Sequence, residues 1–214
     1  MRKITPFLIV SSILLLLIAC QKEQSLETKG ATPGTGGSSG GGGSTNGTEV
    51  GTWKYLYAKQ VFNQSVEANA GIGVMKSVSS ADFTTINNSG TIKFDGATAD
   101  VTNLATSIDA TMKVSSYLGG TLLSSQDVPI TGSLPASSYT TTYKKIGTDS
   151  LYFPDGLIDL GGSGASSANG YKLKWVDDKM TLTEVFDDNT TEVVNGISAK
   201  VVEHTVTVIT LQKQ

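Results

Sequence analysis

The chain has 214 residues, of which 38% are apolar, 16% charged and 7% aromatic; this length fits one domain, or one domain with an unstructured arm. The single cysteine, Cys20, excludes a disulfide within the chain and a cysteine-based zinc site. The formal net charge is -3, with 16 Lys and Arg against 19 Asp and Glu, which argues against the clustered basic residues that a nucleic-acid partner needs, so no such partner is expected.

Residues 1–19 have the composition of a signal peptide. Arg2 and Lys3 provide a positive start, and residues 7–19 form an apolar run that only two serines interrupt. In a helix this run would span roughly 20 Å, which is shorter than the ~30 Å hydrocarbon core of a bilayer. The pattern therefore predicts a cleaved signal peptide and not a membrane span.

The run closes on Leu17-Ile18-Ala19-Cys20, which resembles the lipobox of bacterial lipoproteins. The resemblance implies that residues 1–19 are removed, and that Cys20 carries diacylglycerol and an N-terminal acyl chain, with no other cofactor. Acyl chains contribute about 0.8 kcal/mol per buried CH₂, so several of them hold a protein stably on a membrane. Gln21 after the cysteine resembles the outer-membrane class in Gram-negative bacteria, which implies the outer membrane, on its periplasmic face or at the cell surface.

Residues 20–48 are predicted to be the lipidated cysteine and a flexible tether. Residues 30–47 contain nine glycines, three serines and three threonines. A glycine-rich coil of this length has a root-mean-square reach of roughly 30 Å. The tether would therefore hold the remaining domain, residues 49–214, clear of the lipid head groups.

The domain alternates apolar and polar residues with the period of two that is typical of β-strands. The clearest case is the pair 171–175 and 179–183, which Asp177-Asp178 separates and which predicts a hairpin. The helical spacing of Val101 and Leu104 would also allow one helix, around residues 97–107. Candidate strands, in chain order, are 52–62, 90–95, 108–117, 121–130, 139–146, 151–160, 171–175, 179–183 and 199–211, with turns at 95–96, 119–120, 154–156, 187–189 and 195–196.

These elements predict an all-β fold, an antiparallel up-and-down β-barrel of about 8–10 strands, with a β-sandwich as the alternative. Gly51-Thr52-Trp53 opens the first strand as the Gly-x-Trp motif of lipocalins does. Together with residues 149–156, 171–175 and 205–213 it resembles the lipocalin-like domains of Bacteroidetes lipoproteins.

The resemblance covers residues 49–214 and implies a membrane-anchored barrel that binds a small apolar or amphipathic ligand. It implies structural roles for Gly51 and Trp53, with Trp53 closing one end of the barrel. Lipocalins usually place an arginine near the chain end across this tryptophan. Only Lys200 or Lys213 could take that place here.

Candidate ligand-binding residues are the aromatic side chains of the predicted strands and the only histidine, namely Trp175, Tyr171, Tyr143, Tyr152 and His204. Three alternatives stay open: a packed core, an exposed glycan-binding or adhesive surface, and a structural module without a small ligand. His204 shares a strand face with Val202 and Val206, so it either enters a ligand cavity or lies hydrogen-bonded and idle. The oligomeric state is left open.

The sequence does not indicate an enzyme or a metal site. No Gly-x-Ser-x-Gly nucleophile elbow follows a strand, so a serine hydrolase is not expected. Residues Asp187–Glu192 offer oxygen ligands but lack the 12-residue loop of an EF-hand. We expect a solvated turn there, with Ca²⁺ binding left open.

Overall fold

The computed structural model describes residues 48–69, 71, 73–158, 169–194 and 197–214. All of them belong to a unit formed by residues 44–214. Every regular element in the described residues is a β-strand, and every strand pair is antiparallel. The predicted all-β antiparallel fold is therefore confirmed.

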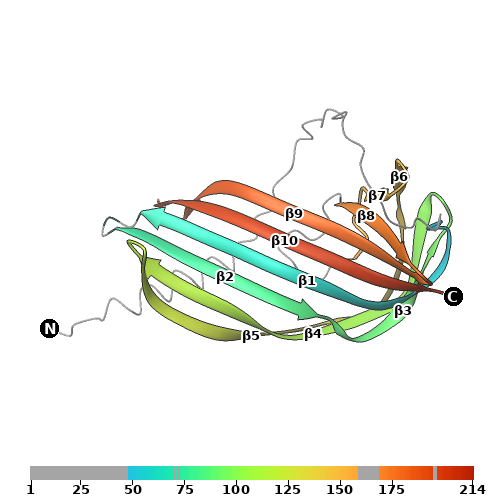
Figure 1. Ribbon diagram of the computed structural model, residues 1–214, viewed down its shortest axis with the longest axis horizontal. Coiled ribbons are helices and arrows are strands. Elements are labelled where there is room, and N and C mark those ends of the chain that lie inside the picture. Colours follow the sequence, from blue (N-terminus) through green and yellow to red (C-terminus); the bar gives the residue numbers. More distant parts are fainter. Residues whose placement is uncertain (1–47, 70, 72, 159–168, 195–196) are drawn as a thin grey trace. The chain divides into compact units, whose positions relative to one another are not determined.

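The strands form one 10-stranded sheet, drawn in Figure 1. Their bounds are β1 (Gly51–Asn69), β2 (Val74–Thr84), β3 (Ile86–Phe94), β4 (Thr98–Leu118), β5 (Thr121–Thr142), β6 (Lys144–Ile146), β7 (Ser150–Phe153), β8 (Asn169–Val176), β9 (Lys179–Val194) and β10 (Ile197–Lys213).

Each strand pairs mainly with its neighbours in sequence, and the first strand pairs with the last. β2 and β3 follow one another along β1, with β3 beside its start and β2 beside the rest, and both also pair with β4. β5 pairs with β4, β1 pairs with β10, and the path continues from β10 through β9, β8 and β7 to β6. Only Tyr143 separates β5 from β6.

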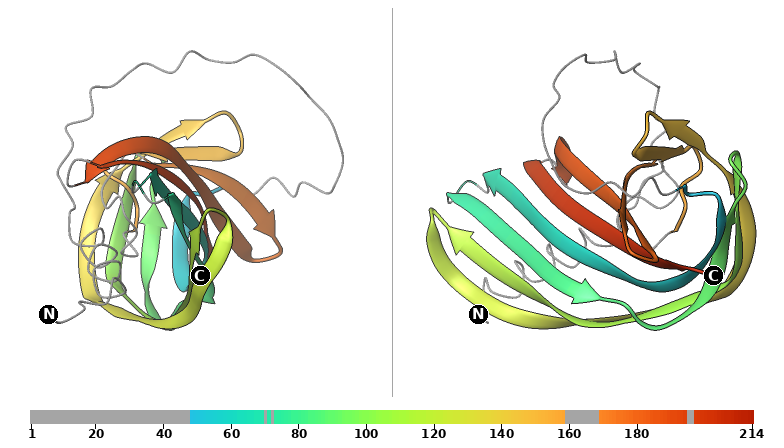
Figure 2. Two further views of the ribbon diagram at one scale, coloured as in Figure 1. Left: turned by 90° about the vertical axis from the view of Figure 1, so that its left-hand side faces the viewer. Right: turned by 45° about the vertical axis from the view of Figure 1, so that its right-hand side comes forward.

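The sheet has a half built from long strands and an end where the short strands gather. β1, β2, β4, β5, β9 and β10 run along the long half, whereas β3, β6, β7 and β8 gather near the C-terminus (Figure 1). Figure 2 shows the sheet curling around its length. The buried core lies at the short-strand end, with Tyr55, Phe94, Leu151, Phe153 and Leu211 among its members.

Strand alternation assigns each side chain to one of two faces. We call the face that carries the core the inner face, because Ala58, Leu182 and Ile209 lie on it and are at most 1% exposed. Ala58 is opposite Ile209, and Ile209 is opposite Leu182. On each of these strands, the side chains two, four and six residues away from the core continue the inner face into the long half.

The helix that the spacing allowed around residues 97–107 does not form, because residues 98–107 belong to β4. The pairing of β4 with β5 shifts register between Val101 and Leu104, and both side chains are buried. A β-bulge inserts an extra residue, so two inward side chains come to lie three positions apart. That spacing is also the helical one, which explains why the sequence allowed a helix here.

Other predicted boundaries differ in informative ways. The hairpin of β8 and β9 is confirmed, with Trp175 opposite Met180 and a positive φ at Asp177. The predicted turn at 187–189 is wrong, since these residues lie inside β9. β2 was not predicted because most of its residues are polar, and the strand predicted at 151–160 ends at Phe153. The turn at 195–196 lies outside the described residues.

The turn between β3 and β4 depends on Asp95. Its carboxylate accepts hydrogen bonds from the backbone N–H groups of Thr98 (2.6 Å) and Ala97 (2.8 Å) and from the Thr98 hydroxyl (2.8 Å). The bonds from Thr98 and Ala97 lower the pKa of Asp95 from 3.8 to about 2. Such bonds favour the charged carboxylate, which is therefore the form that stabilises this turn.

We expect the stabilising effect of Asp95 to depend on pH. Because its pKa is lower in the folded state, its contribution is complete above about pH 4 and is lost as the pH falls toward 2. Asp95→Ala should lower the urea midpoint at pH 7, and its difference from the unmodified protein should shrink at pH 2. Asp109→Ala, which removes an exposed acid from β4, is the control. A difference that does not change with pH would contradict this account.

Candidate functional site

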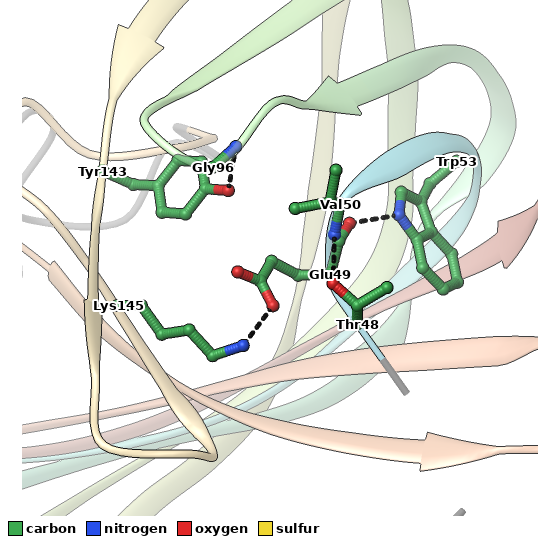
Figure 3. Close-up of polar contacts among 7 residues, drawn as sticks. All are labelled: Thr48, Glu49, Val50, Trp53, Gly96, Tyr143 and Lys145. Atoms are coloured by element: carbon green, nitrogen blue, oxygen red, sulfur yellow. Dashed lines mark hydrogen bonds and ion pairs between the residues drawn. The ribbon is translucent and has the colours of Figure 1, made fainter. Parts of the chain in front are cut away.

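The first residues of the domain are tied into the core by polar contacts (Figure 3). The indole N–H of Trp53 donates a 2.7 Å hydrogen bond to the Glu49 carbonyl oxygen, and the Glu49 carboxylate pairs with the Lys145 ammonium. The Glu49 side chain is only 4% exposed, so its charge needs this partner. The chain therefore enters the sheet at a fixed point beside the core.

Trp53 lies in the core at 2% exposure. Lys213 is opposite Trp53 in the β1–β10 pair, and its ammonium nitrogen lies 5.8 Å from the centroid of the indole ring. This distance allows a cation–π contact. Lys213 thus occupies the place across Trp53 that the sequence left to Lys200 or Lys213. Gly51 has a φ of +134°, which favours glycine.

Two of the predicted ligand-binding residues belong to a chain of packed rings. Tyr143 packs edge-on against Phe94 and tilted against Phe153, and Phe153 packs edge-on against Tyr171. The Tyr143 hydroxyl accepts a 2.9 Å hydrogen bond from the Gly96 N–H (Figure 3). Burial raises the pKa of Tyr143, against the effect of that bond. Tyr143 is thus a satisfied core residue.

Tyr171 lies at the boundary between this aromatic core and a polar row on the inner face. The row crosses neighbouring strands, because Gln60 is opposite Thr207 and Thr207 is opposite Glu184. The Gln60 amide donates a 3.3 Å hydrogen bond to the Thr207 hydroxyl. Glu184 follows Thr183, which pairs with Lys172, so Glu184 and Tyr171 are neighbours across β8 and β9. We call Gln60, Thr207, Glu184 and Tyr171 the polar row.

The two titratable members of the polar row affect one another. Burial raises the pKa of the Tyr171 phenol, and the charge of Glu184 adds to the shift. Burial also raises the pKa of Glu184, although the nearby Tyr171 hydroxyl counteracts this. Weak hydrogen-bond interactions of the phenol with the Glu184 and Asn169 side chains also affect these pKa values, although none of these contacts has standard hydrogen-bond geometry. The row therefore contains a partly buried carboxylate that the Tyr171 phenol helps to stabilise.

Two buried polar atoms on β8 have no hydrogen-bond partner in the described part of the chain, the Tyr171 hydroxyl and the Trp175 indole nitrogen. Tyr171 is 1% exposed, and Trp175 is partly buried against the core. Their positions, four residues apart on one strand, place both side chains on the inner face. Buried polar atoms are satisfied in nine cases of ten or more, so these two are groups that a bound molecule could satisfy.

Further acidic and aromatic residues follow the polar row along the inner face. In the next row, Phe62 is opposite Thr205, and Thr205 is opposite Phe186. In the row after it, Gln64 is opposite Glu203 and donates a 3.2 Å hydrogen bond to it. Glu203 is 7% exposed and also accepts a bond from Thr205.

Tyr152 and His204 lie on the other face of the sheet. Tyr152 is 37% exposed, between the buried Leu151 and Phe153. The His204 ring is half-exposed, and its Nδ1 lies 2.6 Å from an Asp187 oxygen. Neither side chain joins Tyr171 and Trp175 on the inner face.

Glu184, Gln60 and Thr207 are not among the residues predicted for the site. Only the alternation of 179–183, continued by one residue, could have indicated that Glu184 follows Leu182 onto the inner face. Gln60 and Thr207 are brought together by strand pairing over a long sequence separation, which no local pattern reveals.

Asp187–Glu192 does not gather its oxygen atoms. These residues continue β9, so consecutive side chains point to opposite faces. No group of three or more His, Cys, Asp or Glu side chains that could hold a metal ion is found within the described ranges. Cys20, the predicted lipidation site, lies outside those ranges.

A hollow lies beside β3, where the pairing of β3 with β4 shifts register. It has a volume of about 520 Å³. It is lined by no aromatic or hydrophobic residue, and its lining consists of Lys54, Asn88, Ser89, Gly90, Thr91, Thr102, Asn103 and Gln214. Pockets for small ligands are usually lined by hydrophobic and aromatic side chains, so this hollow is a weaker candidate than the inner face.

Comparisons of the chain with protein-family models, with curated proteins and with solved structures found no match. No helix in the residues that the structure describes is long and apolar enough to cross a membrane. The resemblances to bacterial lipoproteins and to lipocalins therefore stay predictions, and the function is argued from the inner face.

Proposed function

We propose that this protein is a non-enzymatic lipoprotein, anchored to the outer membrane by lipid on Cys20. Its domain forms a lipocalin-like barrel that binds a small amphipathic molecule on its inner face. Residues 1–19 are the signal peptide in this proposal, and residues 20–48 are the tether. The remaining chain, residues 49–214, is the binding domain.

The pairing path supports a barrel over a sandwich. If β2 with β3, and β5 with β6, each count as one strand, the 10 strands reduce to eight. Each of the eight then has two neighbours, since β4 borders the β5 part and β7 borders the β6 part of the same long strand. Every pairing joins sequence neighbours or the first and last strands, as in up-and-down barrels.

The observation that carries the ligand-binding proposal is the pair of unpartnered buried atoms, the Tyr171 hydroxyl and the Trp175 nitrogen. Tyr171 borders the polar row, and Trp175 lies four residues further along β8 against the core, opposite Met180. The two atoms together suit a molecule with an apolar and a polar part. Trp175 and Tyr143 point inward, which supports this function over a flat glycan-binding platform. We leave Tyr152 and His204 out of the proposed site.

Binding can be tested on the full chain by tryptophan fluorescence. We expect small amphipathic molecules to change the emission of Trp175, and a panel of oligosaccharides to leave it unchanged. Trp175→Phe should remove the response, whereas Trp53→Phe should keep it, because the Trp53 indole nitrogen already donates to the Glu49 carbonyl and its ring is 2% exposed. If both panels give no response with the unmodified protein, the ligand-binding proposal fails.

The anchor is tested separately by membrane partition. The unmodified protein should stay with the membrane fraction, and Cys20→Ser should release it into the soluble fraction. This result would show that the acyl chains on Cys20 hold the protein on the membrane. Two or more acyl chains anchor a protein stably, and the serine variant would carry no acyl chain. A serine variant that stays in the membrane fraction would overturn the lipoprotein assignment.

A further inference from the structure

The three hairpins at the far end of the long half share one charge pattern. They join β1 to β2, β4 to β5, and β9 to β10 (Figure 1). The runs 68–75, 114–126 and 193–199, which contain the hairpin ends, have no Asp, Glu, Lys, Arg or His. We call the described residues of these three runs the distal end.

The distal end is one continuous region of the sheet. The Gly119 N–H donates a 2.9 Å hydrogen bond to the Val74 carbonyl oxygen, which joins the second hairpin to the first. Ala68 is opposite Ala199 in the β1–β10 pair, which joins the third hairpin to the first. The three hairpin ends therefore lie side by side.

Large apolar side chains are exposed at the distal end. They are between 37% and 73% exposed, and they are Val74, Leu122, Leu123, Val193 and Ile197. Val193 is the most exposed large hydrophobic residue in the described part of the chain. Single exposed apolar residues need no explanation, whereas a group of them without charges indicates an interaction site.

Charged residues of both signs border each apolar hairpin end. Glu67 is directly opposite Lys76 between β1 and β2, and also opposite Lys200 between β1 and β10. Lys113 is directly opposite Asp127 between β4 and β5. We call these bordering residues the charged belt, which consists of Glu67, Lys76, Lys113, Asp127, Glu192 and Lys200. Its acids and lysines are equal in number.

Apolar ends followed by a charged belt match the layers of a lipid bilayer. A strand rises about 3.3 Å per residue, so the Glu67–Lys76 pair lies roughly 7 Å from Val74 along the strands. The head-group region is about 5–8 Å thick on each side of the ~30 Å hydrocarbon core. Side chains of the hairpin ends can thus reach the hydrocarbon while the belt stays among the head groups. The Lys59–Asp82 ion pair (3.1 Å) lies further along the strands and limits insertion to the ends.

We propose that the distal end inserts shallowly into the bilayer that holds the acyl chains of Cys20. The inference rests on the anchor in the function proposed above and adds a second contact with the same membrane. Anchoring raises the local concentration of the distal end at that membrane, so a modest apolar contact suffices. Three separate protruding ends without a shaped groove suit a fluid lipid surface.

The length of the tether allows this second contact. Residues 21–48, extended at about 3.3 Å per residue, span roughly 90 Å, whereas the 19-residue strand β1 is roughly 60 Å long. The tether can therefore run from Glu49 back along the domain to the membrane. Burial of the exposed apolar side chains offsets the entropy that an extended tether loses.

The test places a fluorophore on the lipidated full chain in vesicles. Cys20 is the only cysteine and is acylated in this proposal, so an introduced cysteine is the only one that reacts with the label. Leu123→Cys labels the distal end, and Val176→Cys labels the β8–β9 hairpin at the other end, where the native side chain is equally exposed at 52%. We expect spin labels on lipid acyl chains to quench the label at position 123 and not at 176. Because the belt is neutral, phosphatidylcholine vesicles should give the same result with and without phosphatidylglycerol.

A second substitution checks that apolar burial drives the contact. With the label at position 123, Val193→Asp should shift the balance between inserted and free ends about tenfold toward the free state. Val185→Asp is the control and should leave quenching unchanged. Val185 is also exposed, lies on the same strand and, by strand alternation, on the same face.

The outcomes separate this inference from the proposed anchor. The inference is overturned if the label at 123 is quenched no more than the label at 176, if quenching requires phosphatidylglycerol, or if both aspartate variants reduce it equally. It is also overturned if the label at 123 is shielded in vesicle-free Cys20→Ser protein with the mass of a dimer, because the distal end then binds a second copy. If the unmodified protein does not stay with the vesicles, the proposed anchor fails, and this inference fails with it.

Discussion

Gly90→Ala should destabilise the domain severely. A Cβ atom at this position would lie 2.6 Å from the Leu104 Cα and 2.8 Å from both the Leu104 nitrogen and the Asn103 oxygen, all backbone atoms that cannot rotate away. Gly90 also has a φ of +107°, a backbone conformation that residues with a side chain adopt only under strain. Strain and overpacking each cost about 1–3 kcal/mol, so we expect a loss of about 3–5 kcal/mol in unfolding free energy.

Gly96→Ala is the matched control. Gly96 has almost the same φ, +104°, but an added Cβ would meet no atom within 4 Å. This variant therefore reports the cost of strain alone, about 1–3 kcal/mol. Urea unfolding of both variants measures the difference. If both variants lost the same unfolding free energy, β3 and β4 would be able to move apart at Gly90. The bulge would then not determine the distance between the two strands.

The same bulged region shows where local patterns fail. Gly90 lies against Leu104, close to the register shift that brings Val101 and Leu104 to one face. A sequence records the spacing of apolar residues but not the extra residue that a bulge inserts. The sequence pattern around residues 97–107 is therefore compatible with a helix as well as with a strand. Only the pairing of β4 with β3 and β5 decides its conformation.

Strands with regular alternation were predictable. The hairpin of β8 and β9 has alternating residues on both sides of a two-residue turn, so periodicity and turn chemistry agree. β2 was not predictable in this way, because Ser77, Ser79 and Ser80 interrupt its apolar residues. It is held by β1 and β4 on its two sides, which is a tertiary cause.

The candidate site was predictable only in part. Tyr171 and Trp175 follow from the alternation of β8, and the structure places both side chains on the inner face. Tyr152 lies between the buried Leu151 and Phe153, so it points away from the core. Which face of β7 packs on the core cannot be read from the sequence of one four-residue strand. The polar row needs β1, β10, β9 and β8 side by side before Gln60, Thr207 and Glu184 meet.

Trp53→Ala should lower stability about as much as Gly90→Ala, without changing the binding site. Trp53 is 2% exposed, donates a hydrogen bond to the Glu49 carbonyl and lies beneath the Lys213 ammonium. Replacing a buried Trp by Ala typically costs about 3–5 kcal/mol. A domain of this size has roughly 5–15 kcal/mol of net stability, so the denaturation midpoint should fall steeply.

The distinction between a structural and a binding role comes from measuring both properties. Ligand affinity of the folded fraction should be unchanged in Trp53→Ala, because Trp53 aligns with Lys213 at the core end and the polar row begins further along at Gln60. Tyr57→Ala, which truncates a 40% exposed ring on the same strand, should change the midpoint little. A stable Trp53→Ala variant that cannot bind ligand would show that Trp53 belongs to the site and does not close the end of the fold.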